Sequence, residues 1–347
     1  MDNELKEIPE KRQVLFLIAG VFILIGLGIG LYFGLNQTQA MKPSGSVEKV
    51  TIADGTSANS APLYVAVDKG YFRREGLDVS LQIYRSGKEA LDALIVTKAD
   101  LAFAADTPVM FRIMGGDKIS IVATVFETVK LHAIVARKDR GISKPGDLSG
   151  KRIGVTKGTS GQFFLDNFLI FNRIRREGVR VIFLPPDEML RFLKEGRVDA
   201  VSVWDPYGRR LQEGLGTNGI SFRYEVVDRM FWNAVAIQDF VKKNPASVKK
   251  ILRCLIRGVG FIREKPNEAR RIVASTLKMD ELQIAEFWNT SNFGVTLPPA
   301  LIMNLEDQAR WAIKNKLTDK KTVPNFLNYI YFDALRAVEP GAVTIAH

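Results

Sequence analysis

The sequence contains very few residues of the kinds that form disulfide bonds or bind structural metals. Among 347 residues there are one cysteine, Cys254, and two histidines, His132 and His347. This composition excludes a disulfide framework and leaves no Cys/His ligand set for a zinc ion. It also removes most Cys–His and Ser–His nucleophile arrangements, because His132 is the only histidine away from the chain terminus. We therefore expect no catalytic residues, no metal site and no cofactor.

Nucleotide-binding and nucleic-acid-binding signatures are also missing. The GxGxxG-like glycine spacing lies inside an apolar run, and Gly150-Lys151-Arg152 lacks the serine or threonine of a GxxxxGK[ST] loop. Four arginines between residues 173 and 180 have no interleaved aromatic residues and match no recognised motif. We interpret them as a solvated face or a surface near anionic lipid headgroups, and expect no nucleic-acid partner.

What the chain does contain is enough apolar sequence for a large core and an excess of positive charge. It is 46% hydrophobic and 25% charged, and it is long enough for two domains. Lysine and arginine number 49 against 38 aspartates and glutamates, a formal charge of +11. Residues 1–49 hold five charges of each sign, so the excess belongs to the remainder and favours anionic partners.

The N-terminal part has one long apolar run. Residues 14–35 contain no charge, and this length lets a helix cross a hydrocarbon core of roughly 30 Å. The run is longer than the apolar region of a cleavable signal peptide, and Lys11 and Arg12 precede it. We expect a cytoplasmic tail at 1–13 and a single-pass signal anchor at 14–35 in the inner membrane, with the remainder on the periplasmic side. Cleavage after Ala40 is the alternative.

Two further features accompany this run. Gly26, Gly30 and Gly34 fall on one face of a helix, a spacing that permits a helix-mediated dimer, although glycine is common in membrane helices in any case. Residues 36–48 are polar and include Pro43 and Gly45, as is typical of a linker.

Beyond residue 48, strand-like and helix-like segments alternate in two similar series. This alternation predicts an α/β fold with mostly parallel sheets. The series share three landmarks in the same order: Gly55-Thr56-Ser57 with Gly158-Thr159-Ser160, residues 73–76 with residues 175–178, and Asp100 and Asp106 with Asp199 and Asp205. We expect two lobes of one plan, lobe 1 at 49–138 and 229–347 and lobe 2 at 139–228, with a cleft between them. The end of the chain, to about residue 335, is expected to be helical.

The segment Gly158-Thr159-Ser160 lies where a predicted strand ends and a helix begins. Its backbone N–H groups and hydroxyls suit an oxyanion, although serine and threonine also serve as ordinary N-caps. The segment 55–61, GTSANSA, repeats the arrangement on the other lobe, which favours ligand binding.

Two aspartates near prolines have two interpretations. Asp205-Pro206 is the pattern of an N-cap followed by proline at N1, and Asp106-Thr107-Pro108 is similar. Alternatively, Asp205 contacts an ammonium or hydroxyl group of a ligand. Trp204 and Trp232 are expected either to line the pocket or to pack structurally, and His132 is expected to be a packed or partly exposed residue on a strand near the hinge.

Several passages in order resemble a known family, from about residue 50 to residue 328. They are APLYVAVDKGYFRREGLDVSL, GKEALDAL, KADLAFAADTPV, DLSGKRIGVTKGTSGQFFL and GRVDAVSVWDPY. The chain resembles the periplasmic substrate-binding proteins of the nitrate, sulfonate, taurine and thiamine-precursor type, the NMT1/THI5-like branch of type II binding proteins of ABC transporters.

The resemblance implies a bilobed periplasmic-binding-protein type II fold that closes on a small anionic or zwitterionic nutrient and delivers it to an ABC permease. It implies that these residues face the cleft: Thr56, Ser57, Asn59, Ser86, Gly87, Asp106, Thr107, Gly158, Thr159, Ser160, Trp204 and Asp205. A thiamine-precursor or pyrimidine ligand and a ligand-sensing module for a membrane signalling partner are the alternatives. An enzyme is disfavoured, because no histidine lies in a predicted cleft loop.

Overall fold

The computed structural model describes residues 47–224, 229–288 and 291–346. The predicted cytoplasmic tail, the signal anchor, its glycine face and nearly all of the linker lie outside the described residues. Among the residues that are described, no helix combines the length and the apolar character needed to cross a bilayer. Residues 47–347 form one compact unit, and both lobes belong to it.

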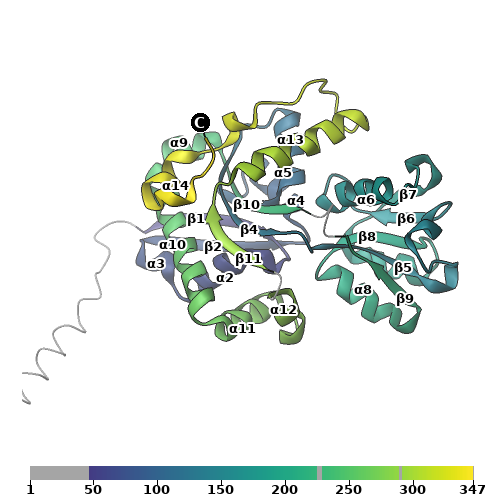
Figure 1. The fold of residues 1–347 in the computed structure, drawn as a ribbon. Helices are drawn as coiled ribbons and strands as arrows, with labels where there is room; N and C mark the ends of the chain where they lie inside the picture. The colour runs from purple at the N-terminus through teal and green to yellow at the C-terminus, as the bar shows by residue number, and fades with distance from the viewer. Residues whose placement is uncertain (1–46, 225–228, 289–290, 347) are drawn as a thin grey trace, which may run out of the picture. The chain divides into compact units, whose positions relative to one another are not determined.

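The first sheet combines strands from the start of the unit with strands from much later in the chain. It contains β1 (Glu48–Gly55), β2 (Leu77–Tyr84), β3 (Leu101–Ala105), β4 (Ile119–Thr128), β10 (Met230–Ile237) and β11 (Asn292–Thr296). Their spatial order is β11-β4-β10-β3-β1-β2. β1 is parallel to β2 and β3, whereas β10 is antiparallel to β3 and β4. This sheet with its helices is lobe 1 (Figure 1).

The second sheet is built from one continuous stretch of chain. It contains β5 (His132–Arg137), β6 (Arg152–Val155), β7 (Arg180–Phe183), β8 (Ala200–Trp204) and β9 (Gly219–Phe222). Their order is β7-β6-β8-β5-β9, with β6 parallel to β7 and β8 and with β5 antiparallel to β8 and β9. This sheet with its helices is lobe 2.

The two sheets repeat one plan. The order β2-β1-β3-β10-β4 in lobe 1 matches β7-β6-β8-β5-β9 in lobe 2, and in each lobe the antiparallel strand is the first to follow a crossing from the other lobe. The prediction of two lobes with the same α/β plan is confirmed. The predicted boundary at residue 138 was wrong, because β5 obtains its hydrogen-bonding partners from β8 and β9 and therefore belongs to lobe 2. The crossing lies at residues 129–131, between β4 and β5.

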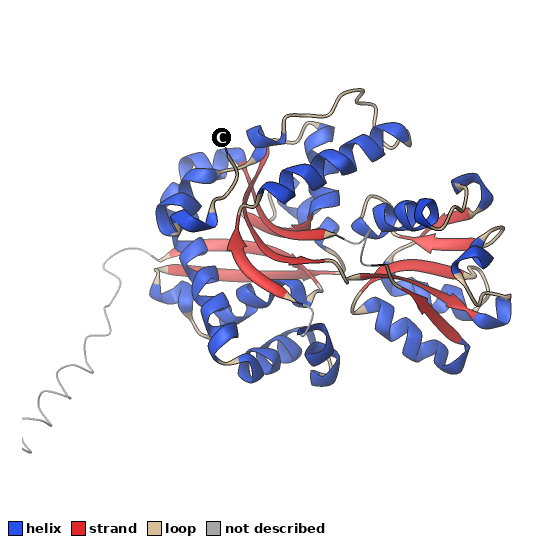
Figure 2. Ribbon diagram, viewed as in Figure 1, coloured by secondary structure: helices blue, strands red, loops and turns tan. Residues whose placement is uncertain are grey.

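Helices cover both faces of the sheet in lobe 1 and flank the sheet in lobe 2 (Figure 2). Those of lobe 1 are α2 (Ala61–Asp68), α3 (Tyr71–Arg74), α4 (Gly87–Ile95), α5 (Asp106–Gly115), α9 (Gln238–Lys243), α10 (Pro245–Glu264), α11 (Pro266–Leu277), α12 (Glu281–Trp288), α13 (Pro299–Lys314) and α14 (Phe332–Val338). Those of lobe 2 are α6 (Ser160–Phe171), α7 (Met189–Lys194) and α8 (Tyr207–Leu215). The predicted helical end of the chain is largely confirmed, but β11 interrupts it and joins the sheet through β4.

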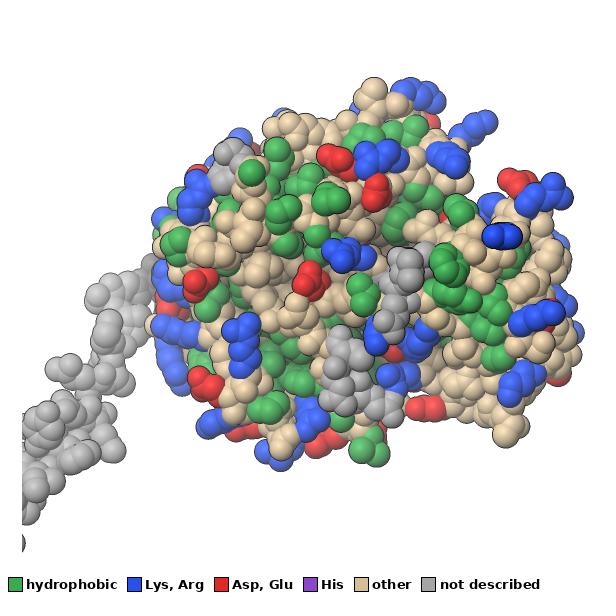
Figure 3. Space-filling model, in the orientation of Figure 1, with side chains coloured by type: hydrophobic (Ala, Val, Ile, Leu, Met, Phe, Trp, Pro, Cys, Tyr) green, Lys and Arg blue, Asp and Glu red, His purple; other side chains and the backbone are tan. Residues whose placement is uncertain are grey.

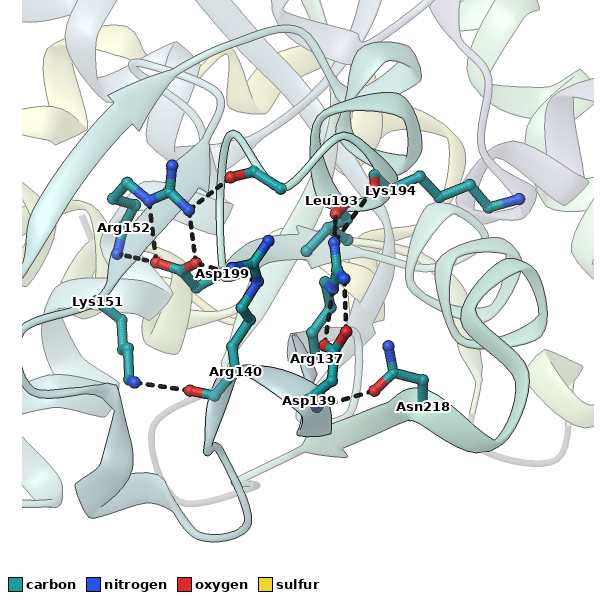
Figure 4. A network of polar contacts seen from close by, with 10 residues as sticks. Arg137, Asp139, Arg140, Lys151, Arg152, Leu193, Lys194, Asp199 and Asn218 are labelled. Atoms are coloured by element: carbon teal, nitrogen blue, oxygen red, sulfur yellow. Dashed lines mark hydrogen bonds and ion pairs between the residues drawn. The ribbon is translucent and has the colours of Figure 1, made fainter.

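An aspartate just before β3 is hydrogen-bonded to β1 in lobe 1, and an aspartate just before β8 is hydrogen-bonded to β6 in lobe 2. Oδ2 of Asp100 accepts a hydrogen bond from the backbone N–H of Thr51 at 2.8 Å, and Oδ2 of Asp199 accepts one from that of Arg152 at 2.9 Å. Figure 4 shows Asp199 held by the Arg152 guanidinium, with Arg140 beside it. The two aspartates are therefore structural landmarks at the strand starts, distant from the cleft.

Candidate functional site

One pocket lies where the two lobes face each other, at the carboxyl ends of β1, β3 and β8. Its lining residues come from both lobes: Gly55, Thr56, Ser57, Asn59, Ser86, Gly87, Lys88, Ala105, Pro108, Leu131, Thr159, Ser160, Trp204 and Trp232. We call it the inter-lobe pocket. Its free volume is about 20 Å³, and a second cavity of about 660 Å³ shares Ser86, Lys88 and Pro108 with it. The carboxyl ends of strands in open α/β sheets are where ligands bind.

The amide of Asn59 is buried in this pocket without a hydrogen-bond partner. Asn59 is 1% exposed, and neither its Oδ1 nor its Nδ2 bonds to any described residue. Leaving a buried polar group unpaired costs roughly 1–3 kcal/mol. A ligand that accepts from or donates to this amide would recover that free energy.

The neighbouring residues of the same loop have structural bonds. The hydroxyl of Ser57 accepts from the backbone N–H of Asn59 at 3.2 Å and caps the short 3-10 helix Ala58–Ser60. The hydroxyl of Thr56 donates to the carbonyl of Tyr84 at 2.9 Å, which ties the loop to the end of β2. These bonds hold the loop so that Asn59 remains in the pocket.

A buried chain of hydrogen bonds fixes Trp232 in the pocket wall. Its Nε1–H donates to the hydroxyl of Ser60 at 2.7 Å, and that hydroxyl donates to Oδ1 of Asp54 at 2.8 Å. The backbone N–H of Gly55 donates to the same oxygen at 2.8 Å. Burial raises the pKa of Asp54 to about 8, because water cannot solvate its charged form. Asp54 is therefore mostly protonated at neutral pH.

Two glycines let lobe 1 backbone segments approach closely behind the pocket. A Cβ added to Gly55 would lie 2.4 Å from the backbone nitrogen of Gly87. A Cβ added to Gly87 would lie 2.5 Å from the Trp232 ring and 2.9 Å from Cα of Ala104. Any larger residue at either position would push the pocket walls apart.

On lobe 2, the hydroxyls at the start of α6 do not cap the helix. Thr159 is the N-cap residue, but its hydroxyl donates to the carbonyl of Thr156 at 2.7 Å and no side chain caps α6. The hydroxyl of Ser160 lies 2.8 Å from Nε2 of His132. The interpretation of these residues as ordinary N-caps was therefore wrong for their side chains, and among the described residues no side chain caps the amides at the N-terminus of α6.

His132 positions the Ser160 hydroxyl. The imidazole is 2% exposed and stacks on Phe164, with ring centroids 5.3 Å apart. The expectation of a packed histidine on a strand is confirmed, and from this strand the imidazole contacts a residue of the cleft. β5 begins at His132 beside Trp204 of β8, which brings the imidazole to the start of α6.

The charge around the inter-lobe pocket favours an anion. The described lining residues include no carboxylate and one cation, Lys88, whose Nζ lies 2.9 Å from Oδ2 of Asp92. The N-termini of α4 and α6 begin in the lining at Gly87 and Ser160. Both helix ends place partial positive charge at the pocket.

Eight of the twelve predicted site residues line the inter-lobe pocket: Thr56, Ser57, Asn59, Ser86, Gly87, Thr159, Ser160 and Trp204. Ser86 also caps α4, because its hydroxyl accepts from the backbone N–H of Glu89. Gly158 lines the neighbouring cavity, and its N–H donates to Oε1 of Gln162 at 2.8 Å.

Asp106 and Thr107 lie outside the pocket lining. Both are fully buried, and the Asp106 carboxylate accepts from the backbone N–H of Phe231 at 3.0 Å and from Nδ2 of Asn304 at 2.6 Å. Burial raises the pKa of Asp106 to about 6. The expected N-cap role was wrong, because α5 begins at Asp106 itself with Ala105 as its N-cap. Asp106 instead joins α5 to β10 and α13.

Asp205 also lies outside the inter-lobe pocket. Its two carboxylate oxygens each lie 3.0 Å from Nη2 of Arg223, and Arg209 is 3.3 Å away. It borders a separate, smaller cavity. The predicted N-cap role was wrong, because the N-cap of α8 is Pro206. The contact of Asp205 with a ligand ammonium group is not supported by this placement.

Sequence reasoning missed Lys88, Asp54 and the contact between His132 and Ser160. Lys88 directly follows the predicted Ser86-Gly87 turn, and this adjacency could have indicated that it lines the pocket. Asp54 precedes Gly55 at the end of an apolar strand, where a buried carboxyl is unusual. The contact of His132 with Ser160, 28 residues apart, had no local signal.

Several contacts join the lobes around the pocket. The indole N–H of Trp311, on α13 of lobe 1, donates to Oδ2 of Asp166, on α6 of lobe 2, at 2.9 Å. The hydroxyl of Tyr207 donates to the carbonyl of Arg85 at 3.1 Å. These bonds and the small free volume describe lobes that are closed on each other. Within the described ranges, no cluster of three or more His, Cys, Asp or Glu side chains is arranged to hold a metal ion.

Comparisons with known proteins agree with this architecture. The family model described as NMT1/THI5 like matches residues 57–269. A Bacillus subtilis protein named for binding aliphatic sulfonates is 24% identical over 90% of this chain and 92% of its own. The taurine-binding periplasmic protein of Escherichia coli is 26% identical over 60% of this chain and 64% of its own. The structure of the periplasmic aliphatic sulphonate binding protein SsuA from Escherichia coli superposes with a TM-score of 0.68 at 20% identity, covering 82% of this chain and 98% of that one.

Proposed function

Because the chain belongs to the NMT1/THI5-like family, we propose that it is an extracytoplasmic solute-binding protein that captures a small anion between its lobes. The observation that carries this proposal is the unpaired, buried amide of Asn59 in a pocket whose described lining has no carboxylate. The ligand is held by Asn59, the Ser160 hydroxyl and the N-terminus of α6.

The ligand class follows from this chemistry together with the relatives. A sulfonate has several oxygens that can accept hydrogen bonds from the α6 amides and from Nδ2 of Asn59 at the same time. The relatives are named for aliphatic sulfonates and taurine, and nitrate binding is named for a structural neighbour, NrtA from Synechocystis, with a TM-score of 0.66 and 16% identity. We therefore place sulfonates first and nitrate second. The larger cavity next to the pocket would accept the organic part of a sulfonate.

Ligand entry requires the lobes to separate, because the pocket has little free volume in the closed arrangement. Closure on the ligand would reform the Trp311–Asp166 bond and present a closed form to an ABC permease. The apolar run 14–35 would anchor the protein in the inner membrane with its lobes on the periplasmic side, and its glycine face would permit a helix-mediated dimer.

The test is a thermal-shift screen of residues 46–347 with taurine, longer alkanesulfonates, nitrate, and pyrimidine or thiamine precursors. A ligand at 100 times its Kd should add about 2.7 kcal/mol to the free energy of unfolding and raise the midpoint. Asn59→Leu should abolish this shift while leaving the unliganded protein at least as stable, because an unpaired amide is removed.

The matched control is Thr107→Val. The hydroxyl of Thr107 is likewise buried without a partner among the described residues, but it lies outside the pocket lining. Loss of the shift in both variants would contradict the assigned site. Stabilisation by a pyrimidine alone would favour the thiamine-precursor alternative, and no stabilisation at all would favour a sensing module. Turnover, or a covalent adduct on Ser160 in mass spectra, would show an enzyme instead.

A further inference from the structure

One end of lobe 1 carries a concentrated set of basic side chains around the start of β1. We call this set the basic face: Lys49, Arg73, Arg74, Lys242, Lys243, Lys249, Lys250, Arg253 and Arg257. They come from β1, α3, the end of α9 and one side of α10. Figure 3 shows lysine and arginine side chains gathered at the end of lobe 1 that carries α3 and α10.

Hydrogen bonds and ion pairs bring these elements together. The backbone N–H of Glu48 donates to the carbonyl of Gly76 at 3.0 Å, and the Glu48 carboxylate accepts from the hydroxyl of Ser247 on α10. Arg253 and Arg257 both pair with Glu75, at 2.6 and 3.3 Å. The start of β1, the turn after α3 and the basic side of α10 therefore form one continuous surface.

Much of the positive charge on the basic face is not neutralised. Within the described part of the chain, no ion pair joins Lys49, Arg73, Lys249 or Lys250 to a carboxylate, and Arg253 and Arg257 share one glutamate. The corresponding end of lobe 2 differs, because Arg152 is bonded to Asp199 and Arg137 to Asp139 (Figure 4). The charge excess at the lobe 1 end is therefore available to an anionic partner.

The apolar run that precedes β1 favours a membrane surface as that anionic partner. Eleven residues, 36–46, separate the apolar run 14–35 from Val47. Eleven residues span at most about 40 Å when fully extended, and a flexible chain of that length spans about 20 Å on average. If the apolar run crosses a bilayer, the basic face is the part of the folded unit kept nearest to its surface.

We propose that the basic face binds the anionic headgroups of the membrane in which the chain is anchored. The proposal rests on the proposed membrane anchoring. Each lysine or arginine close to an anionic lipid surface strengthens binding by roughly fivefold. β1 runs from the basic face at Glu48 to the inter-lobe pocket at Gly55, a distance of about 23 Å, so binding at this face leaves the pocket uncovered.

The experiment measures cosedimentation of residues 46–347 with lipid vesicles. The core residues of the described unit begin at Val50, so removing the preceding segment removes none of the core. We expect binding to vesicles of phosphatidylglycerol and phosphatidylcholine at about 3:7, weakening steeply as salt rises, and no binding to pure phosphatidylcholine. Equal binding to both vesicles would overturn the proposal.

The variants locate the surface. The double change Lys249→Glu and Lys250→Glu should weaken vesicle binding at least tenfold. The matched control, Arg173→Glu with Arg175→Glu, makes the same charge change on exposed lobe 2 arginines, which were interpreted above as a solvated face or a lipid-facing surface. The present proposal requires the solvated face, so this control should leave binding within about twofold. Equal loss in both would show a general charge effect and would overturn the assignment to this face.

Two further outcomes separate this proposal from others. Binding to native inner-membrane vesicles but not to protein-free anionic vesicles would overturn it in favour of a protein partner. The ligand-induced thermal shift is measured separately and should be unchanged in the lysine double variant. A silent ligand screen with intact vesicle binding would therefore remove the proposed function and leave the lipid-binding face standing.

Discussion

The two Gly-Thr-Ser segments have the same sequence but different surroundings. In lobe 1 the segment 55–57 follows Asp54, a fully buried carboxyl bonded to Ser60 and Gly55. In lobe 2 the segment 158–160 follows Lys157, which is exposed and lies over the Phe183 ring. One segment is built into a buried polar network, and the other leaves a helix N-terminus and a histidine-bound hydroxyl at the pocket.

The structurally equivalent threonines of the two lobes are not the two that the repeated Gly-Thr-Ser triplet pairs. The hydroxyl of Thr56 donates to the carbonyl of Tyr84 at 2.9 Å, and that of Thr156 donates to Leu184 at 3.0 Å. Thr56 follows Gly55, the last residue of β1, and Thr156 follows Val155, the last residue of β6, which has the place of β1 in the lobe 2 sheet. Thr156, and not Thr159, is therefore the structural counterpart of Thr56. A repeated triplet can mark the same neighbourhood in two lobes without marking the same position.

The largest contrast should appear when the two leading glycines are changed to alanine. Gly55→Ala places a Cβ 2.4 Å from backbone nitrogen and should cost about 4 kcal/mol of folding free energy. In Gly158→Ala the added Cβ lies at ordinary contact distances of 3.7 and 3.9 Å from its neighbours. The folding free energy lost is about 1 kcal/mol, because alanine must adopt the left-handed φ of +71°. Urea unfolding of both variants measures the difference. Equal losses would show that the lobe 1 backbone adjusts easily.

Asp54 should make the stability of the protein depend on pH, whereas the residue before the lobe 2 triplet is the exposed Lys157 and not a buried carboxyl. Its pKa is raised from 3.8 when unfolded to about 8 when folded, so between these values the folded state retains a proton that the unfolded state loses. Its contribution to stability is therefore complete below about pH 4 and declines as pH rises to about 8. Asp54→Asn should become more stable relative to the parent by about 3 kcal/mol between pH 5 and pH 8.

Thermal unfolding across this pH range, with both proteins in the same buffers, provides the measurement. Asp106, whose pKa is also raised, is present in both proteins and cancels from the difference. A difference between parent and variant that does not change with pH would mean that Asp54 is ionised in the folded protein.

The smallest effect tests the equivalence of Thr56 and Thr156. Thr56→Val and Thr156→Val each remove one hydrogen bond to a carbonyl at the end of the neighbouring strand and should each cost about 1 kcal/mol. Chemical denaturation gives both values. We expect them to agree within about 0.5 kcal/mol, since the bonds are alike in length and partner. A much larger loss for Thr156→Val would argue against the equivalence.

Local sequence was sufficient to predict much of the pocket. Glycine, serine and threonine at the junctions of strands and helices indicated where backbone N–H groups and hydroxyls would converge. The residues of these junctions that line the pocket are Thr56, Ser57, Asn59, Thr159 and Ser160. Ser86 and Gly87, which also line it, were implied by the family resemblance. The predictions failed for side chains whose partners are distant. Asp205 was predicted to face the ligand, yet Arg223 pairs with it, and Asp106 bonds to Phe231 and Asn304.

The sequence by itself determined the two-lobed α/β plan and the pocket's position at the strand ends, because alternating apolar segments and helix-start residues act over a few neighbouring positions. The tertiary structure alone decided the side-chain pairs: His132 with Ser160, Trp232 with Ser60 and Asp54, and Trp311 with Asp166. It also placed β5 in lobe 2. These side-chain pairs and the placement of β5 depend on which strands and helices from distant parts of the chain pack together. Local patterns of polarity and turn residues do not specify that packing.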